Sequence, residues 1–186
     1  MEICREWAVE VDQNRERYNL GPQEKFIVEF IGSLYARIEA GDITLSKIQS
    51  MHFTRIFHPD RDDIGAYVRL RIFADDQELH DIDQEIDSRL KASAQSGNVF
   101  KVKKKDLNWE KCAENYGGTE VASLFRDYLD SISRISYKLL YKKQQGFDVE
   151  KVLWPWTHFF FNASRGYGRS VIELAQGAVT GFLPNI

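Results

Sequence analysis

The chain has 186 residues, of which 43% are hydrophobic and 28% charged, as in a soluble globular protein, so we expect one domain over residues 1–186. Its net charge of −3 gives no reason to expect nucleic-acid or membrane binding, and no apolar stretch is long enough to cross a bilayer. Cys4 and Cys112 form no metal-binding pattern, and we expect neither a metal nor a cofactor. The N-terminus lacks a secretory signal, which favours a cytoplasmic protein with free thiols.

The first half of the chain is predicted to supply most of the strands. Residues 3–11 alternate between apolar and polar side chains, as a strand does. Apolar residues over 22–40 recur at helical spacing. Residues 48–57 and 66–73 are further strands, and we expect them to form an antiparallel hairpin.

The second half is predicted to be mostly helical. The expected elements are a helix that starts after Asp75 or Asp76 and ends near Gly97, a short strand at 99–102, an irregular segment at 108–118, a long helix from Thr119 to Gly146, and further helices from Asp148 to Phe161 and over 169–179. Strands early and helices late predict an α+β fold, in which an antiparallel sheet from the N-terminal half packs with several helices mostly from the C-terminal half.

The longest predicted helix carries an apolar stripe that we expect to be buried. Its members are Val121, Leu124, Phe125, Tyr128, Leu129, Ile132, Ile135 and Leu139. This stripe predicts that the helix packs on the core.

One strand, residues 67–73, carries two arginines on one face. Strict alternation sends Arg69 and Arg71 to the side framed by Tyr67 and Phe73. Two guanidinium groups in register either bind a carboxylate or pair with local acids on a solvated face, and the flanking rings favour a cleft. Arg55 joins the same side in one register of the hairpin, but register cannot be read from the sequence.

A histidine near the C-terminus lies among aromatic rings. His158 follows Trp-Pro-Trp-Thr and precedes three phenylalanines, so its pKa can fall where it acts as an acid or base. Asn162, one helical turn later, is placed to orient the ring. Alternatively, His158 bonds a carbonyl that Pro155 leaves without its helical partner.

A glycine-rich turn precedes the long helix. Tyr116 stands before Gly117 and Gly118, and the exposed N–H groups at the start of the helix suit an anion. The alternative is a simple turn and helix cap. The lysines at 101 and 103–105 are more simply a solvated face than a nucleic-acid patch.

Six short motifs follow one another along nearly the whole chain. They are Trp7-Ala8-Val9, His52 to Pro59, Tyr67 to Arg71, Asn115 to Gly118, Asp130-Ser131, and His158 with Asn162. Their order and spacing resemble the thiopeptide-type bacteriocin biosynthesis domain found at the C-terminus of lantibiotic dehydratases, which also occurs as a stand-alone protein.

The resemblance implies maturation of a ribosomally synthesised peptide. In the family, a Ser or Thr of a precursor peptide is glutamylated from charged tRNA by a separate domain. The C-terminal domain then eliminates glutamate to leave a dehydroamino acid, and relatives perform a cycloaddition instead. The expected partners are a precursor peptide and a glutamylating or other maturation enzyme, with no direct nucleic-acid or membrane contact.

The resemblance also assigns roles to individual residues. Arg69 and Arg71 would stabilise negative charge on the substrate or on the leaving glutamate, and His158 would carry the proton. The expected substrate-binding residues are Arg55, Tyr67, Tyr116 and Asn162.

Four positions depart from the family pattern. Asn115 stands where the family has arginine, Cys112 where it has glutamate, Tyr67 where it has histidine and His58 where it has aspartate. These departures leave open a catalytically silent protein that binds the peptide or scaffolds a partner enzyme. A small-molecule cyclase is a third possibility.

Overall fold

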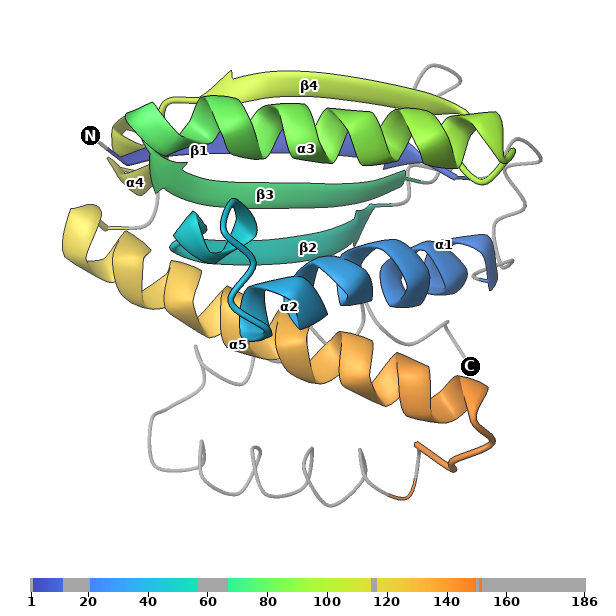
Figure 1. The fold of residues 1–186 in the computed structure, drawn as a ribbon. Helices are drawn as coiled ribbons and strands as arrows, with labels where there is room; N and C mark the ends of the chain where they lie inside the picture. Colours follow the sequence, from blue (N-terminus) through green and yellow to red (C-terminus); the bar gives the residue numbers. More distant parts are fainter. Residues whose placement is uncertain (1, 12–20, 57–66, 115–116, 150, 152–186) are drawn as a thin grey trace, which may run out of the picture. The chain divides into compact units, whose positions relative to one another are not determined.

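The computed structural model describes residues 2–11, 21–56, 67–114, 117–149 and 151 (Figure 1). The chain divides into two compact units, Met1–Tyr141 and Lys142–Ile186. The first unit holds every described strand. The described part of the second unit is the end of the last helix and the few residues after it.

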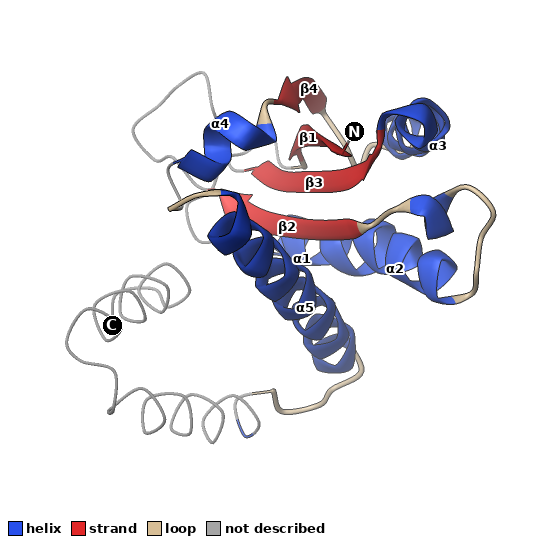
Figure 2. Ribbon diagram, turned by 90° about the vertical axis from the view of Figure 1, so that its left-hand side faces the viewer, coloured by secondary structure: helices blue, strands red, loops and turns tan. Residues whose placement is uncertain are grey.

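The centre of the first unit is a four-stranded antiparallel sheet in the order β2-β3-β1-β4 (Figures 1 and 2). Its strands are β1 (Glu2–Glu10), β2 (Ser50–Ile56), β3 (Tyr67–Asp75) and β4 (Lys101–Leu107). Pairing of β2 with β3 confirms the predicted hairpin, and the sheet with its helices confirms the predicted α+β class.

Helices connect and cover the strands. They are α1 (Gly21–Phe26), the π-helical turn η1 (Ile27–Ile31), α2 (Gly32–Glu39), the 3-10 turn η2 (Leu45–Lys47), α3 (Asp76–Gln95), α4 (Trp109–Glu114) and α5 (Thr119–Gln144). The first three run on without a break, so the helix predicted over 22–40 is present with a π-helical turn inside it. None of the described helices has the length and apolar character that a membrane span requires.

One face of the sheet packs against α1, α2 and α3 and forms the main core. Trp7 and Leu70, which are cross-strand partners, are fully buried there together with Ile31 and Ile82. The helix-covered side of the sheet therefore follows the predicted alternation of the strands. Burial of each such side chain contributes about 1.5–3 kcal/mol, so this face supplies much of the folding free energy.

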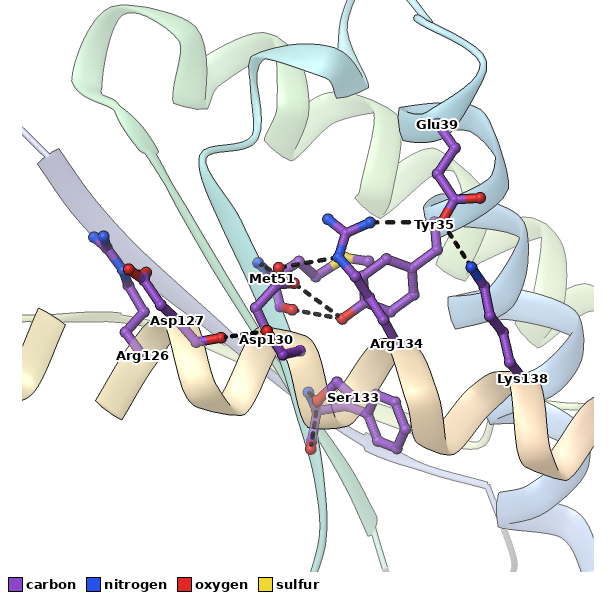
Figure 3. Close-up of polar contacts among 11 residues, drawn as sticks. Tyr35, Glu39, Met51, Arg126, Asp127, Asp130, Ser133, Arg134 and Lys138 are labelled. Carbon is purple, nitrogen blue, oxygen red and sulfur yellow. Dashed lines mark hydrogen bonds and ion pairs between the residues drawn. The ribbon is translucent and has the colours of Figure 1, made fainter. Parts of the chain in front are cut away.

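The outer edge of β2 is closed by side chains from two helices (Figure 3). The backbone N–H of Met51 bonds to Asp130 Oδ1 at 3.3 Å, and that of Phe53 bonds to Ser133 Oγ at 3.1 Å. Tyr35, from α2, donates to the Met51 carbonyl oxygen at 2.5 Å. These bonds satisfy backbone groups that an edge strand otherwise leaves open.

The structure corrects three predictions for the second half of the first unit. The strand predicted at 99–102 is β4, which begins at Lys101 and runs through the lysines to Leu107. The segment predicted to be irregular contains α4. The helix predicted from Thr119 is α5, but its apolar stripe is not buried.

The predicted stripe of α5 is largely exposed because another side of this helix meets the sheet. Ala122 and Ser133 are the α5 residues that are buried in the described structure. Ser133 meets the backbone edge of β2, and Ala122 packs in the buried cluster that contains Phe73 and Trp109. The exposed members of the stripe are Val121, Leu124, Phe125, Tyr128, Ile132 and Ile135.

Candidate functional site

The face of the sheet opposite to α1, α2 and α3 carries a cluster of charged side chains. The register places Glu6 opposite Arg71 and Ala8 opposite Arg69, while β4 places Lys105 on the other side of Glu6. Because side chains at cross-strand positions share a face, the four charged groups meet. We call this side of the sheet the basic face and define it by Glu6, Arg69, Arg71 and Lys105. It confirms that the two arginines project to one side.

Glu6 is the centre of the basic face. Arg71 Nε donates to Glu6 Oε2 at 2.8 Å, and Arg69 Nε lies 3.3 Å from the same oxygen. Lys105 Nζ lies 3.1 Å from Oε1. A single carboxylate therefore orients three cations that come from β3 and β4, the two strands that flank β1.

Glu6 is ionised at neutral pH although its residue is only 3% exposed. Burial alone would raise its pKa, but hydrogen bonds from Arg71 and Lys105 and the charges of Arg69 and Arg71 outweigh it and lower the pKa. Three positive charges then surround one negative charge. The excess of positive charge suits a further anion, and arginine is the side chain best shaped for a carboxylate.

The arginines of the basic face are open to solvent in part. The side chains of Arg69 and Arg71 are 26% and 19% exposed. Arg69 Nη2 donates to the Tyr67 hydroxyl at 3.2 Å, and its guanidinium carbon is 5.9 Å from the centre of that ring. Tyr67 thus lies beside the arginines as the sequence predicts, and it positions one of them.

An apolar cluster closes one end of the basic face. Phe73 packs edge-on against Trp109 of α4, with ring centroids 4.8 Å apart, and Cys4 and Ala122 are buried with them. Arg126 of α5 places its guanidinium carbon 5.5 Å from the centre of the Phe73 ring. It also bonds to Asp127, its neighbour on the helix. A further cation therefore stands at this closed end.

His52 lies on the same side of the sheet, opposite Arg71 in the β2–β3 register. The residue is 1% exposed, and its ring centroid is 5.7 Å from that of Phe73. Neither ring nitrogen has a hydrogen-bond partner in the described part of the chain. Burial and the positive charges of Arg71, Arg69 and Arg126 lower its pKa to about 4, against the opposing charge of Glu6. The imidazole is therefore neutral at pH 7.

Arg55 does not join the basic face. Its cross-strand partner is Val68, so it projects to the helix-covered side, and the register that would place it beside the other arginines is wrong. Arg55 Nε donates to Gln23 Oε1 at 3.0 Å, and Nη1 lies 3.8 Å from Glu24. The residue that faces Arg69 from β2 is Thr54. Arg55 ties β2 to α1.

Three predicted site residues, Tyr116, His158 and Asn162, lie outside the described residues. The glycines that follow Tyr116 are described. Gly117 has a φ of 88°, and Gly118 N–H donates to the Ala113 carbonyl at 3.0 Å. This N–H closes the end of α4, as in a simple turn and cap, and is not directed at an anion.

Four residues of this region were not predicted to belong to it, namely Glu6, Lys105, Arg126 and His52. Glu6 and His52 both lie in predicted strands, and side chains along a strand alternate between the two faces of the sheet. Without the register between strands, this alternation does not show which face either residue occupies.

A surface pocket of about 360 Å³ lies on the helix-covered side, away from the basic face. Its lining includes Phe26, Phe30 and Phe100. In the described part of the chain, no group of three or more His, Cys, Asp or Glu side chains is arranged to hold a metal ion. No protein-family model matches the sequence, and comparison with curated proteins finds no significant relative.

Proposed function

We propose that the protein binds a carboxylate-bearing peptide on the basic face and acts in the cytoplasmic maturation of a ribosomally synthesised natural-product peptide. The observation that carries the proposal is the pair of partly exposed arginines held by one buried carboxylate. Arg69 and Arg71 each keep part of their side-chain surface open to solvent, and with Lys105 they outnumber the negative charge of Glu6. The family resemblance of the motif order supplies the substrate class.

The proposed reaction is elimination of glutamate from a glutamylated Ser or Thr. A base removes the Cα proton, the electron pair forms the Cα–Cβ double bond, and the Cβ–O bond breaks to release glutamate as a carboxylate. Arg69 and Arg71 stabilise the charge on the substrate carbonyl or on the leaving carboxylate. His158 is the proposed base, and a related cyclisation would use the same charge stabilisation.

The test is incubation of the protein with a glutamylated precursor peptide, followed by mass spectrometry. Loss of glutamate with formation of the dehydroamino acid is expected. Arg71→Ala should reduce the rate by about 100-fold or more, since it removes a group that stabilises developing charge. Arg89→Ala is the matched control, because Arg89 pairs with Glu85 on α3 and not on the basic face. No mass change with a precursor whose glutamylation is verified would refute elimination.

A second candidate function is peptide binding or partner scaffolding without catalysis. It is favoured by one observation: both arginines already form ion pairs with Glu6, so the face is partly neutralised without any ligand. Under this proposal, His158→Ala retains full product formation in vivo, whereas deletion of the protein abolishes it. Under the elimination proposal, both changes abolish product formation.

A further inference from the structure

The second edge of the sheet, formed by β4, is open in the part of the chain that the structure describes. β4 pairs with β1 on one side, and no described strand pairs with it on the other. In the described part of the chain, no side chain bonds to its backbone, in contrast to the edge of β2. An antiparallel edge strand directs about half of its N–H and C=O groups outward. Within the described residues, β4 therefore presents a row of unpaired backbone groups along this edge.

The side chains of β4 give this edge a strong positive charge. Six of its seven residues are exposed, and four of the seven are lysines. Lys101, Lys103 and Lys105 face the same side as the arginines of the basic face, since they are the cross-strand partners of Glu10, Ala8 and Glu6. The basic face thus continues without a break to the open edge.

Two of these lysines are not neutralised within the described structure. Lys105 pairs with Glu6, and Lys104 on the opposite side pairs with Asp83 and Asp87. No ion pair joins Lys101 or Lys103 to a described acidic residue. Their charges are available to a partner that lies along the edge.

The charge of β4 selects between possible occupants. Pairing with β4 of a second copy would bring two lysine-rich strands together, and like charges on neighbouring strands repel. An acidic strand would meet the opposite charge over the same length. Its acidic residues would have to alternate, because only every second side chain of an added strand lies on the side of Lys101 and Lys103.

We propose that β4 receives an acidic peptide segment as a fifth strand, with glutamate or aspartate at every second position facing Lys101 and Lys103. Backbone hydrogen bonds to the edge hold the segment, and the lysines select its sequence. The proposal deepens the proposed function by naming how a peptide is held, and rests on it only in taking a peptide as the ligand.

The test is fluorescence anisotropy with synthetic peptides and the full chain. The probes are a labelled peptide that alternates Glu and Thr, a composition-matched peptide with its glutamates in one block, and a peptide that alternates Lys and Thr. The alternating acidic peptide is expected to bind at least about tenfold more tightly than the other two, and more weakly as salt rises.

Charge-reversal variants locate the binding surface. Lys101→Glu with Lys103→Glu should weaken binding of the alternating peptide at least about tenfold. The matched control is Lys25→Glu with Lys91→Glu, which changes the net charge equally at two exposed helix positions and should leave affinity unchanged. Equal effects of the two double variants would overturn the proposal, since attraction would then depend on net charge alone.

Backbone N-methylation separates strand pairing from attraction by charge. Two versions of the peptide carry N-methyl groups on alternate residues, one version on each of the two sets. Strand addition requires the backbone N–H groups of only the set that points to β4. One version should therefore bind at least about tenfold more weakly than the other. Equal affinities, absence of binding, or a β4-mediated dimer of the chain would overturn the proposal. Glutamate elimination that depends on Arg71 but not on Lys101 and Lys103 would leave the proposed function standing without this inference.

Discussion

Tyr35 donates its hydroxyl hydrogen to the carbonyl oxygen of Met51 across 2.5 Å, and both residues are fully buried. The bond joins α2 to the outer edge of β2 (Figure 3). Burial and the neighbouring Asp130 raise the pKa of Tyr35, against the charge of Arg134, so the hydroxyl remains a donor at every physiological pH. This side chain stands where the next strand of a larger sheet would have placed an N–H group.

The first prediction concerns this bond. Tyr35→Phe removes the donor and leaves the buried Met51 carbonyl without it, so the free energy of unfolding should fall by about 1–3 kcal/mol. Urea unfolding followed by circular dichroism measures the change. Tyr137→Phe is the control, because that ring stacks on Tyr35 at 5.0 Å but its hydroxyl bonds no atom of β2 in the described structure. Equal losses in the two variants would show that the effect does not depend on the bond to Met51.

The second prediction compares two serines of α5. Ser133 Oγ accepts the backbone N–H of Phe53, whereas Ser131 Oγ donates to the Asp127 carbonyl on an exposed part of the same helix. Ser133→Ala should therefore destabilise the fold by about 1–2 kcal/mol, and Ser131→Ala by less than about 0.5 kcal/mol. A common small effect on thermal unfolding would show that Ser133 does not support the edge.

The sequence predicts those features of the site that depend on local period. Alternation over residues 67–73 is sufficient to put Arg69 and Arg71 on one face, and the structure confirms it. The side of the sheet taken by Arg55 depends on the β2–β3 register. That register pairs odd-numbered residues of one strand with even-numbered residues of the other, so Arg55 faces away.

Long-range pairing explains the remaining differences. Glu6 meets the arginines because β1 lies between β3 and β4, a strand order that no local pattern encodes. The stripe of α5 has a helical period, but a period does not identify the surface that a helix will meet. Leu124 is 67% exposed because the side of α5 that carries Ser133 contacts the sheet.

The third prediction concerns Glu6. Glu6→Gln removes the negative charge that holds Arg69, Arg71 and Lys105, so stability should fall by about 1–3 kcal/mol, less than for a fully buried pair because the cations are partly solvated. The same variant should bind a carboxylate ligand more tightly, since the cations lose their internal counterion. Urea unfolding and anisotropy with the alternating acidic peptide measure the two effects. Weaker binding by a folded Glu6→Gln variant would show that Glu6 is needed to shape the site.

The pH dependence of stability gives a related check on Glu6. Its folded pKa is below the ordinary value, so its contribution is present above about pH 4.5 and is lost as the pH falls through the folded pKa. Glu6→Gln should remove this acid-dependent loss while leaving the behaviour above pH 5 unchanged.

The fourth prediction concerns His52, whose pKa lies near 4 when folded and near 6.5 when unfolded. Between these values the unfolded chain binds a proton that the folded chain does not. Stability should therefore fall as the pH drops from 6.5 to 4, by about 3 kcal/mol in total. His52→Phe places an apolar ring at this buried position and should abolish the fall between pH 6.5 and 5, where Glu6 does not titrate. Urea unfolding at pH 7, 6 and 5 measures it.

His80→Gln is the control for this experiment, because His80 is exposed on α3. It should keep the pH dependence of the unaltered chain. A slope that persists in His52→Phe would show that another group titrates in this range, and that the charges around His52 do not hold it neutral. Loss of the slope would confirm that burial, together with the charges of the neighbouring arginines, keeps His52 neutral in the folded chain.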